Sequence, residues 1–141
     1  FHQGKEPQIY EDGNQVRDFV NIHDVVDANI AVMEDQRADY EMYNVGGGAP
    51  ITVNQFASAC AEVYGIKNYQ PKPCGKYRFG DTRHIWSDIS KLQSLGWEPQ
   101  RTIYDSIIEY KEWLGTASSV ENIIEYCEEK MKKLNVLRDI S

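Results

Sequence analysis

One short stretch of this chain could bind an anion. Residues 75–85 gather cations around a single carboxylate: Lys76, Arg78, Asp81, Arg83 and His84. A second segment, QVRDFV, places Arg17 between β-type residues. A planar guanidinium donates two parallel hydrogen bonds to a phosphate and stays charged, so two arginines from separate segments could clamp a diphosphate. The carboxylate of Asp81 could then accept hydrogen bonds from sugar hydroxyls.

These arginines also have an interpretation that needs no ligand. Arg17 could pair with Asp18 or Asp24, and Arg83 with Asp88, on a surface where ion pairs are common and weak. The spacing leaves both alternatives open. The net charge of −7 and the isoelectric point near 4.9 argue against bulk attraction to nucleic acid or an anionic membrane. Any anion must therefore be held by a local cluster.

The composition is that of a soluble globular protein. The 141 residues are 41% hydrophobic and 26% charged, which fits one domain or part of a larger one. Three separated cysteines and the lack of paired histidines indicate neither a disulfide framework nor a metal site, and they favour reduced thiols in the cytoplasm. We find no membrane-spanning run or signal-peptide pattern. Because the first residue is Phe1, we expect the chain to begin partway through a longer one.

No catalytic motif is evident in this sequence. Gly46, Gly47 and Gly48 follow an expected strand and precede a helix, as in a phosphate-binding turn, but the pattern G-x-G-x-x-G is not completed. We therefore interpret the triplet as a flexible strand-to-helix loop. A G-x-S-x-G nucleophile motif is also missing, and Cys60 lies on the apolar face of its expected helix. We predict no catalytic residue in the chain.

The periodicity predicts several helices joined to short strands. Helices are expected over 24–33, over 52–64 with a capping box between Thr52 and Gln55, over 102–114, and from 118 to 134. A short helix carrying Ile89, Leu92 and Leu95 should follow a cap at Ser87 or Asp88. Strand-like segments are expected at 9–10, 16–22, 41–45 and 69–74, with a hairpin or bend at Asp12-Gly13. The class is therefore mixed α/β.

Three segments together resemble a known family. EDGNQVRDFVNIHDVVDANIAVM, YNVGGGAPITVNQFA and KYRFGDTRHIWSDISKLQSLGWEP occur in this order. They are similar to the C-terminal part of the NAD-dependent nucleotide-sugar epimerases and dehydratases, the extended short-chain dehydrogenase/reductase family that includes UDP-glucose 4-epimerase. Within this family, the segments GKYRFGDTRH and EDGNQVRDF most resemble the dTDP-L-rhamnose 4-epimerase branch. The resemblance implies the substrate-binding part of an extended Rossmann-type epimerase over residues 1–115, with an additional amphipathic helix over 116–141.

The resemblance also implies roles for individual residues. Arg17 and Arg78 match arginines that hold the nucleotide diphosphate in relatives, Asp81 matches an aspartate near the ribose, and Tyr10 falls in the strand beside the base pocket. NAD and the catalytic Tyr and Lys would belong to an N-terminal part that is absent here. The implied function is nucleotide-diphosphate binding within a 4-epimerase, which could be a homodimer when full-length. A 4,6-dehydratase fragment and a non-catalytic interaction domain remain the alternatives.

Overall fold

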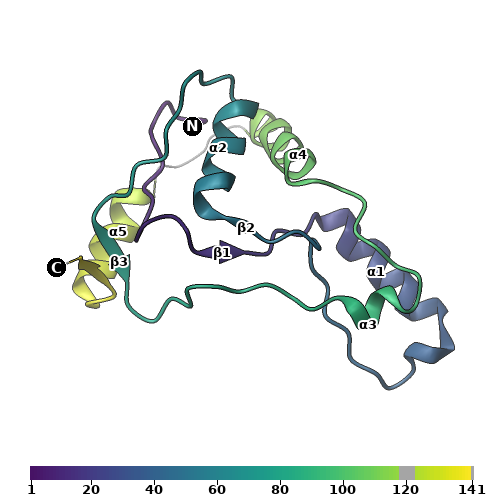
Figure 1. Cartoon of the computed structure of the whole chain (residues 1–141). Helices are drawn as coiled ribbons and strands as arrows, with labels where there is room; N and C mark the ends of the chain where they lie inside the picture. Colours follow the sequence, from purple (N-terminus) through teal and green to yellow (C-terminus); the bar gives the residue numbers. More distant parts are fainter. Residues whose placement is uncertain (118–122, 141) are drawn as a thin grey trace.

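The computed structural model describes residues 1–117 and 123–140 of the chain. Its elements lie in three groups, joined by long extended segments (Figure 1). One group contains α2 (Val53–Val63) and α4 (Ile103–Thr116), and a second contains α1 (Ile22–Glu34) and α3 (Ser90–Gln93). The third contains α5 (Ile124–Lys133), β3 (Lys76–Arg78) and β4 (Leu137–Asp139). The mixed α/β class is confirmed.

The helix starts follow local capping signals. The predicted capping box of α2 is present, since the Thr52 side chain accepts from the backbone of Gln55 and the Gln55 side chain accepts from the backbone of Thr52. Thr102 and Asp105 form the same arrangement at α4. The side chain of Asn21 caps α1, which begins two residues before the expected start. The predicted helices α1, α2 and α4 therefore begin where their caps place them.

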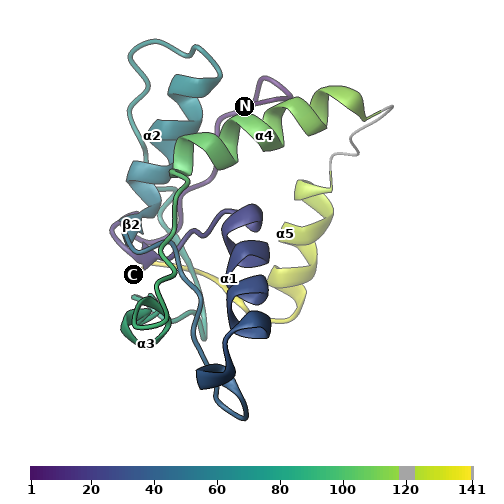
Figure 2. The same cartoon turned by 90° about the vertical axis from the view of Figure 1, so that its right-hand side faces the viewer.

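Helix α2 packs through two kinds of side chain. The face predicted from periodicity, with Val53, Phe56, Cys60 and Val63, is half-buried, and Phe56 stacks on Phe19 with ring centroids 4.3 Å apart. The fully buried residues of α2 are small: Ala57, Ala59 and Ala61. Figure 2 shows α2 and α4 together, with α1 below them. The predicted face is confirmed as a packing surface, but the fully buried positions of α2 are the alanines.

A compact apolar cluster holds α1 against α3. Its buried members are Ala28, Ile89, Leu92 and Trp97. The predicted short helix is present as α3, and Asp88 accepts a hydrogen bond of 2.9 Å from the Ser90 backbone just before it. A 3-10 turn, η1 (Gln36–Ala38), follows α1. Because Ile89 belongs to this cluster, the cluster fixes the C-terminal end of the segment 75–88.

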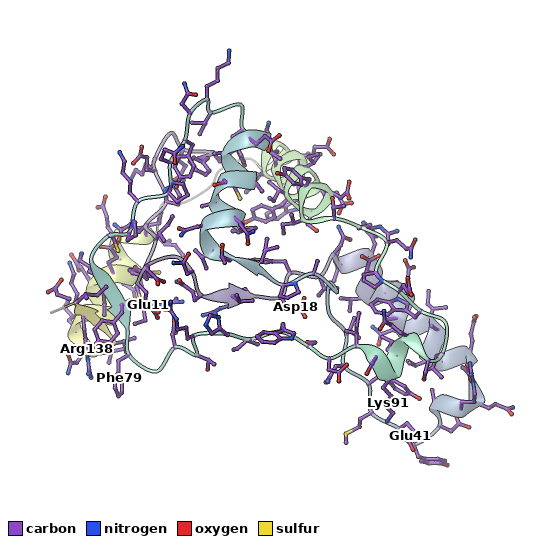
Figure 3. All side chains as sticks on the ribbon, viewed as in Figure 1. Glu11, Asp18, Glu41, Phe79, Lys91 and Arg138 are labelled. Carbon is purple, nitrogen blue, oxygen red and sulfur yellow. The ribbon has the colours of Figure 1, made fainter. Side chains whose placement is uncertain are left out.

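The strands are shorter than the sequence predicted. β1 (Val16–Arg17) pairs antiparallel with β2 (Ile51–Thr52), and β3 pairs antiparallel with β4. The prediction of a strand at 41–45 is wrong: this segment runs beside α3, and its backbone binds side chains instead of another strand. Lys91 Nζ donates to the Met42 carbonyl at 2.9 Å and to Glu41 at 2.7 Å (Figure 3). An extended run needs a partner to become a strand, and the described residues supply none here.

The expected turn at Asp12-Gly13 is present, with the Gly13 amide donating to the Tyr10 carbonyl at 3.3 Å. Gly13 has a φ of +72°, which glycine adopts without steric cost. Ile9 pairs with Pro73, at the end of the predicted strand 69–74, which forms only that isolated bridge. Of the β-rich run over 16–22, only the first two residues are in β1, because the chain enters α1 at Ile22.

The C-terminal segment consists of α5 followed by β4. The predicted amphipathic helix is confirmed over Ile124–Lys133, and the first residues of that prediction, 118–122, lie outside the described part. β4 was not predicted. Among the described residues, no helix is both long and apolar enough to cross a bilayer.

Candidate functional site

Two segments distant in the sequence run side by side through the middle of the molecule. Residues 9–17 and 73–85 are linked by parallel bridges between Ile9 and Pro73 and between Val16 and His84. Backbone hydrogen bonds join Glu11 N to the Lys76 carbonyl at 2.7 Å and Ile85 N to the Val16 carbonyl at 3.1 Å. This pairing brings Tyr10 to the strand that carries Arg78.

The structure brings together Tyr10, Arg78 and Asp81, three of the four residues to which the resemblance gave a role in substrate binding. Arg78 donates from Nε and Nη2 to Asp81 Oδ2, at 2.8 and 2.6 Å. The Arg78 guanidinium carbon lies 5.4 Å from the centroid of the Tyr10 ring, within range of a cation–π interaction. The Arg78 side chain is 42% exposed and the Asp81 side chain 31%, so solvent and a ligand can reach both side chains.

Tyr10 lies in a less polar environment than its two partners. Burial raises the pKa of the Tyr10 hydroxyl above its usual value, and the nearby Glu128 and Cys74 raise that pKa further, while Arg78 opposes them. The tyrosine therefore stays neutral at physiological pH and can offer a hydroxyl donor.

Arg17 is engaged differently from Arg78. Its Nη1 donates to the Val16 carbonyl at 2.8 Å and to the Arg83 carbonyl at 3.0 Å, which ties β1 to the 73–85 segment. Arg83 in turn binds Glu11 and Asp12, each at 2.7 Å. Its hydrogen bond, followed by one from the Asn14 backbone, lowers the pKa of the Asp12 carboxyl. Arg17 is thus linked to the Tyr10 cluster through Arg83 and Glu11.

The ligand-free interpretation named the wrong ion pairs. Arg17 binds backbone carbonyls instead of Asp18 or Asp24, and Arg83 binds Glu11 and Asp12 instead of Asp88. Surface pairing of Arg83 does occur, but with acids that precede it by about 70 residues. His84 has a structural contact, since its Nδ1 accepts from the Val16 backbone at 3.3 Å.

Asp18 was missed by the sequence analysis, although it organises the glycine loop. Its Oδ1 accepts from Gly47 N at 2.8 Å, and its Oδ2 accepts from Ser87 N at 2.9 Å (Figure 3). A Cβ at Gly46 would lie 2.3 Å from Asp18 Oδ2, and one at Gly47 would lie 2.1 Å from the Phe19 carbonyl oxygen. The glycines are needed because chain and carboxylate already fill that space. The loop does not fit a dinucleotide pyrophosphate, since Asp18 occupies the Gly47 donor.

Asp24 is the most deeply buried charged residue described, at 1% exposure. It accepts from Gln100 N at 3.2 Å, from Arg101 N at 3.0 Å and from Arg101 Nη1 at 2.7 Å. The contact fixes the first turn of α1 against the segment that leads into α4. Among the described residues, the ion pairs of Asp24 and Arg101 join α1 to this segment and do not include the Tyr10 cluster, so their role is structural.

The described residues also form an apolar cavity of about 430 Å³ between α2 and α4, with Phe19, Phe56, Tyr64 and Ile107 among its lining. Tyr10, Arg17, Arg78 and Asp81 lie outside it. Among the described residues, no three His, Cys, Asp or Glu side chains are grouped as metal ligands. The three cysteines are free thiols, each half-buried.

Comparisons with known proteins agree with the motifs. Residues 1–46 match the NAD dependent epimerase/dehydratase family. The dTDP-L-rhamnose 4-epimerase of Burkholderia thailandensis is 36% identical over 107 residues, which cover 75% of this chain and 29% of that protein. The chain thus spans about a third of the length of such relatives, as the structures below also show.

Solved structures give the same result. The UDP-glucose 4-epimerase of Thermotoga maritima, crystallised with UDP-glucose, superimposes with a TM-score of 0.64 at 34% identity, over 80% of this chain and 37% of that one. The dTDP-glucose 4,6-dehydratase of Bacillus anthracis, in complex with NAD, gives a TM-score of 0.67 at 25% identity, over 82% and 36%. Sequence motifs, fold and similarity together make this chain a relative of the NAD-dependent epimerases and dehydratases of nucleotide sugars.

Proposed function

We propose that this chain is the C-terminal, nucleotide-sugar-binding part of an NAD-dependent nucleotide-sugar epimerase of the 4-epimerase type. The observation that carries the proposal is the cluster of Tyr10, Arg78 and Asp81, which a pairing of two distant segments assembles at the surface. The similarity to a UDP-glucose 4-epimerase crystallised with UDP-glucose supports the same ligand class.

Arg78 supplies the diphosphate contact in this proposal. Its present partner is Asp81, and a half-exposed pair of this kind contributes only about 0–1 kcal/mol, so a diphosphate can displace it at small cost. Asp81 is then free to accept from the ribose hydroxyls. Arg17 adds positive charge from the other segment, while its bonds to two backbone carbonyls keep its guanidinium fixed.

NAD enters the proposal only through the remainder of the enzyme. The glycine loop at 46–48 cannot hold its pyrophosphate, because Asp18 and the Phe19 carbonyl take that space. We expect the 141-residue chain alone to bind no NAD and to have no epimerase activity, and isothermal titration calorimetry with NAD measures this. The chain would serve by holding and orienting the substrate, which is a large part of catalysis in such enzymes.

The test is a titration of UDP, dTDP and their sugars into the protein encoded by the whole gene. Arg78→Ala should weaken binding by about 1.5–3 kcal/mol, the scale of a charge-assisted hydrogen bond, or roughly 10- to 150-fold. Arg78→Lys should recover only part of this, since an ammonium cannot reproduce the bidentate geometry. Arg37→Ala is the matched control, because it removes an exposed arginine of η1 that pairs with Asp35, the residue that caps this turn. Unchanged affinity in both Arg17→Ala and Arg78→Ala would reject the site.

A 4,6-dehydratase is the second candidate, favoured by the superposition on the Bacillus anthracis enzyme. The two activities share the diphosphate grip and differ in product. Incubation of the whole-gene protein with a dTDP- or UDP-hexose distinguishes them: a change of configuration without loss of mass marks the epimerase, and loss of one water marks the dehydratase.

A further inference from the structure

The C-terminal unit formed by α5 and β4 lies directly against the strand of the proposed site. β4 pairs with β3 in the register Lys76↔Asp139, Tyr77↔Arg138 and Arg78↔Leu137. Two further bonds extend the ladder, from Phe79 N to the Val136 carbonyl at 2.7 Å and from Ile140 N to the Gly75 carbonyl at 2.9 Å. Every residue from 75 to 79 therefore faces the C-terminal strand.

The ladder geometry places Leu137 beside Arg78. Hydrogen-bonded and non-hydrogen-bonded pairs alternate along antiparallel strands. Since Phe79–Val136 and Gly75–Ile140 are bonded pairs, Arg78–Leu137 is a non-bonded pair, whose side chains lie close together on one face. Leu137 is 7% exposed, so it forms a fixed apolar surface next to the arginine stem.

The opposite face of the ladder is fastened as well. The Arg138 guanidinium carbon lies 3.9 Å from the centroid of the Phe79 ring, and both side chains are seen together in Figure 3. Arg138 Nε also donates to the Asn135 carbonyl at 3.0 Å, at the turn between α5 and β4. The unit of α5 and β4 therefore pairs with one edge of β3 and contacts side chains on both of its faces.

α5 also acts electrostatically on Tyr10. The carboxylate of Glu128 in α5 raises the pKa of the Tyr10 hydroxyl, and its Oε1 atom is buried without a hydrogen-bond partner among the described residues. On its other edge, β3 is joined to the 9–11 segment by the bond from Glu11 N to the Lys76 carbonyl. Without β4, a three-residue strand held in this way would be marginal, because short two-stranded pairings are weakly stable by themselves.

We propose that α5 and β4 act as a C-terminal clasp that positions Arg78 for the diphosphate, with Leu137 and the β4 backbone as the positioning elements. This inference rests on the proposed function. The clasp holds the arginine without touching the ligand.

The experiment compares two clasp variants with a charge control in the whole-gene protein. Arg138→Pro removes a ladder N–H and one positive charge, and Leu137→Ala removes the apolar wall beside Arg78. Lys132→Ala removes the same charge from the exposed side of α5. Arg138→Pro should weaken UDP binding about tenfold or more, which approaches the loss expected for Arg78→Ala. Leu137→Ala should weaken UDP binding by less, and Lys132→Ala should leave it unchanged.

Two further readouts separate positioning from general stability. Amide hydrogen exchange should become faster at Tyr77 and Phe79 in Arg138→Pro, while α2 and α4 keep their protection. In a double-mutant cycle, Arg78→Ala should cost much less affinity in the Arg138→Pro background than in the wild type.

The outcomes distinguish the two proposals. Wild-type UDP affinity in Arg138→Pro would overturn the clasp and leave the proposed function standing. An equal cost of Arg78→Ala in both backgrounds, or faster exchange throughout α2 and α4, would also overturn it. A wild-type protein that binds no UDP, dTDP or sugar derivative would reject the proposed function, and the clasp with it.

Discussion

Replacing Asp24 with alanine should destabilise the chain far more than replacing its neighbour Asp27. Both carboxylates bind Nη1 of Arg101, at 2.7 and 2.9 Å, but Asp24 is 1% exposed and the Asp27 side chain is 51% exposed. Asp24 also accepts from the backbone N–H groups of Gln100 and Arg101. Asp24→Ala therefore removes a buried acceptor of three hydrogen bonds, and Asp27→Ala removes one exposed partner.

The magnitude follows from these contacts. Each buried backbone donor left without a partner costs about 1–3 kcal/mol, and loss of one partner from a buried charged contact costs about 3–5 kcal/mol in total. Because Arg101 keeps Asp27 and is partly exposed, we expect the lower end, about 3 kcal/mol, for Asp24→Ala. The exposed pair in Asp27→Ala should cost less than about 1 kcal/mol.

Urea unfolding followed by circular dichroism measures both variants. Asp24→Asn should fall between them, because the amide keeps one acceptor oxygen for the backbone donors. If Asp24→Ala and Asp27→Ala were destabilised equally, within about 0.5 kcal/mol, the argument that burial makes Asp24 important would be wrong.

Two other predictions concern the glycines and pH. Gly47→Ala should lower the free energy of unfolding, because its Cβ would lie 2.1 Å from the Phe19 carbonyl oxygen. In Gly115→Ala the new Cβ meets nothing within 4 Å, so this change in α4 should stabilise the chain by about 0.5–1 kcal/mol. An equal urea midpoint for the two variants would contradict this prediction. Hydrogen bonds from Arg83, Arg37 and Thr102 lower the pKa values of Asp12, Asp35 and Asp105 in the folded chain. Their contribution is complete above the ordinary carboxyl pKa near 4 and is lost as the pH falls through the lower folded values, so the free energy of unfolding should fall below about pH 4. Arg83→Gln should make that fall smaller, and an unchanged pH profile would contradict the assignment.

Features set by neighbouring residues were predictable from the sequence. Thr52 and Gln55 lie three positions apart, so their capping box and the start of α2 could be derived without knowing the fold. The same holds for Thr102 at α4. The meeting of Tyr10 with Arg78 and Asp81 was expected only through the resemblance, because spacing along the chain says nothing about pairing between distant segments.

Features set by distant pairing were missed or wrong. The segment 41–45 has strand-type residues, but Lys91 meets its backbone where a strand would have to be. The segment around Arg138 gave no detectable strand signal, since a three-residue strand carries too little periodicity. Asp18 looked like an ordinary neighbour of Arg17, and its bonds to Gly47 and Ser87 depend on loops that only the folded chain brings together.

The pairing of residues 9–17 with 73–85 has a kinetic consequence. Arg83 reaches Glu11 across 72 positions, and β3 reaches β4 across about 60, so each contact closes a long loop whose entropy must be lost before the contact forms. High contact order of this kind slows folding. The capped helices can form early, but Tyr10 and Arg78 meet only when the chain has collapsed as a whole. A ligand that bridges the two segments would therefore slow global unfolding, and its binding would raise the stability of every element that depends on that closure.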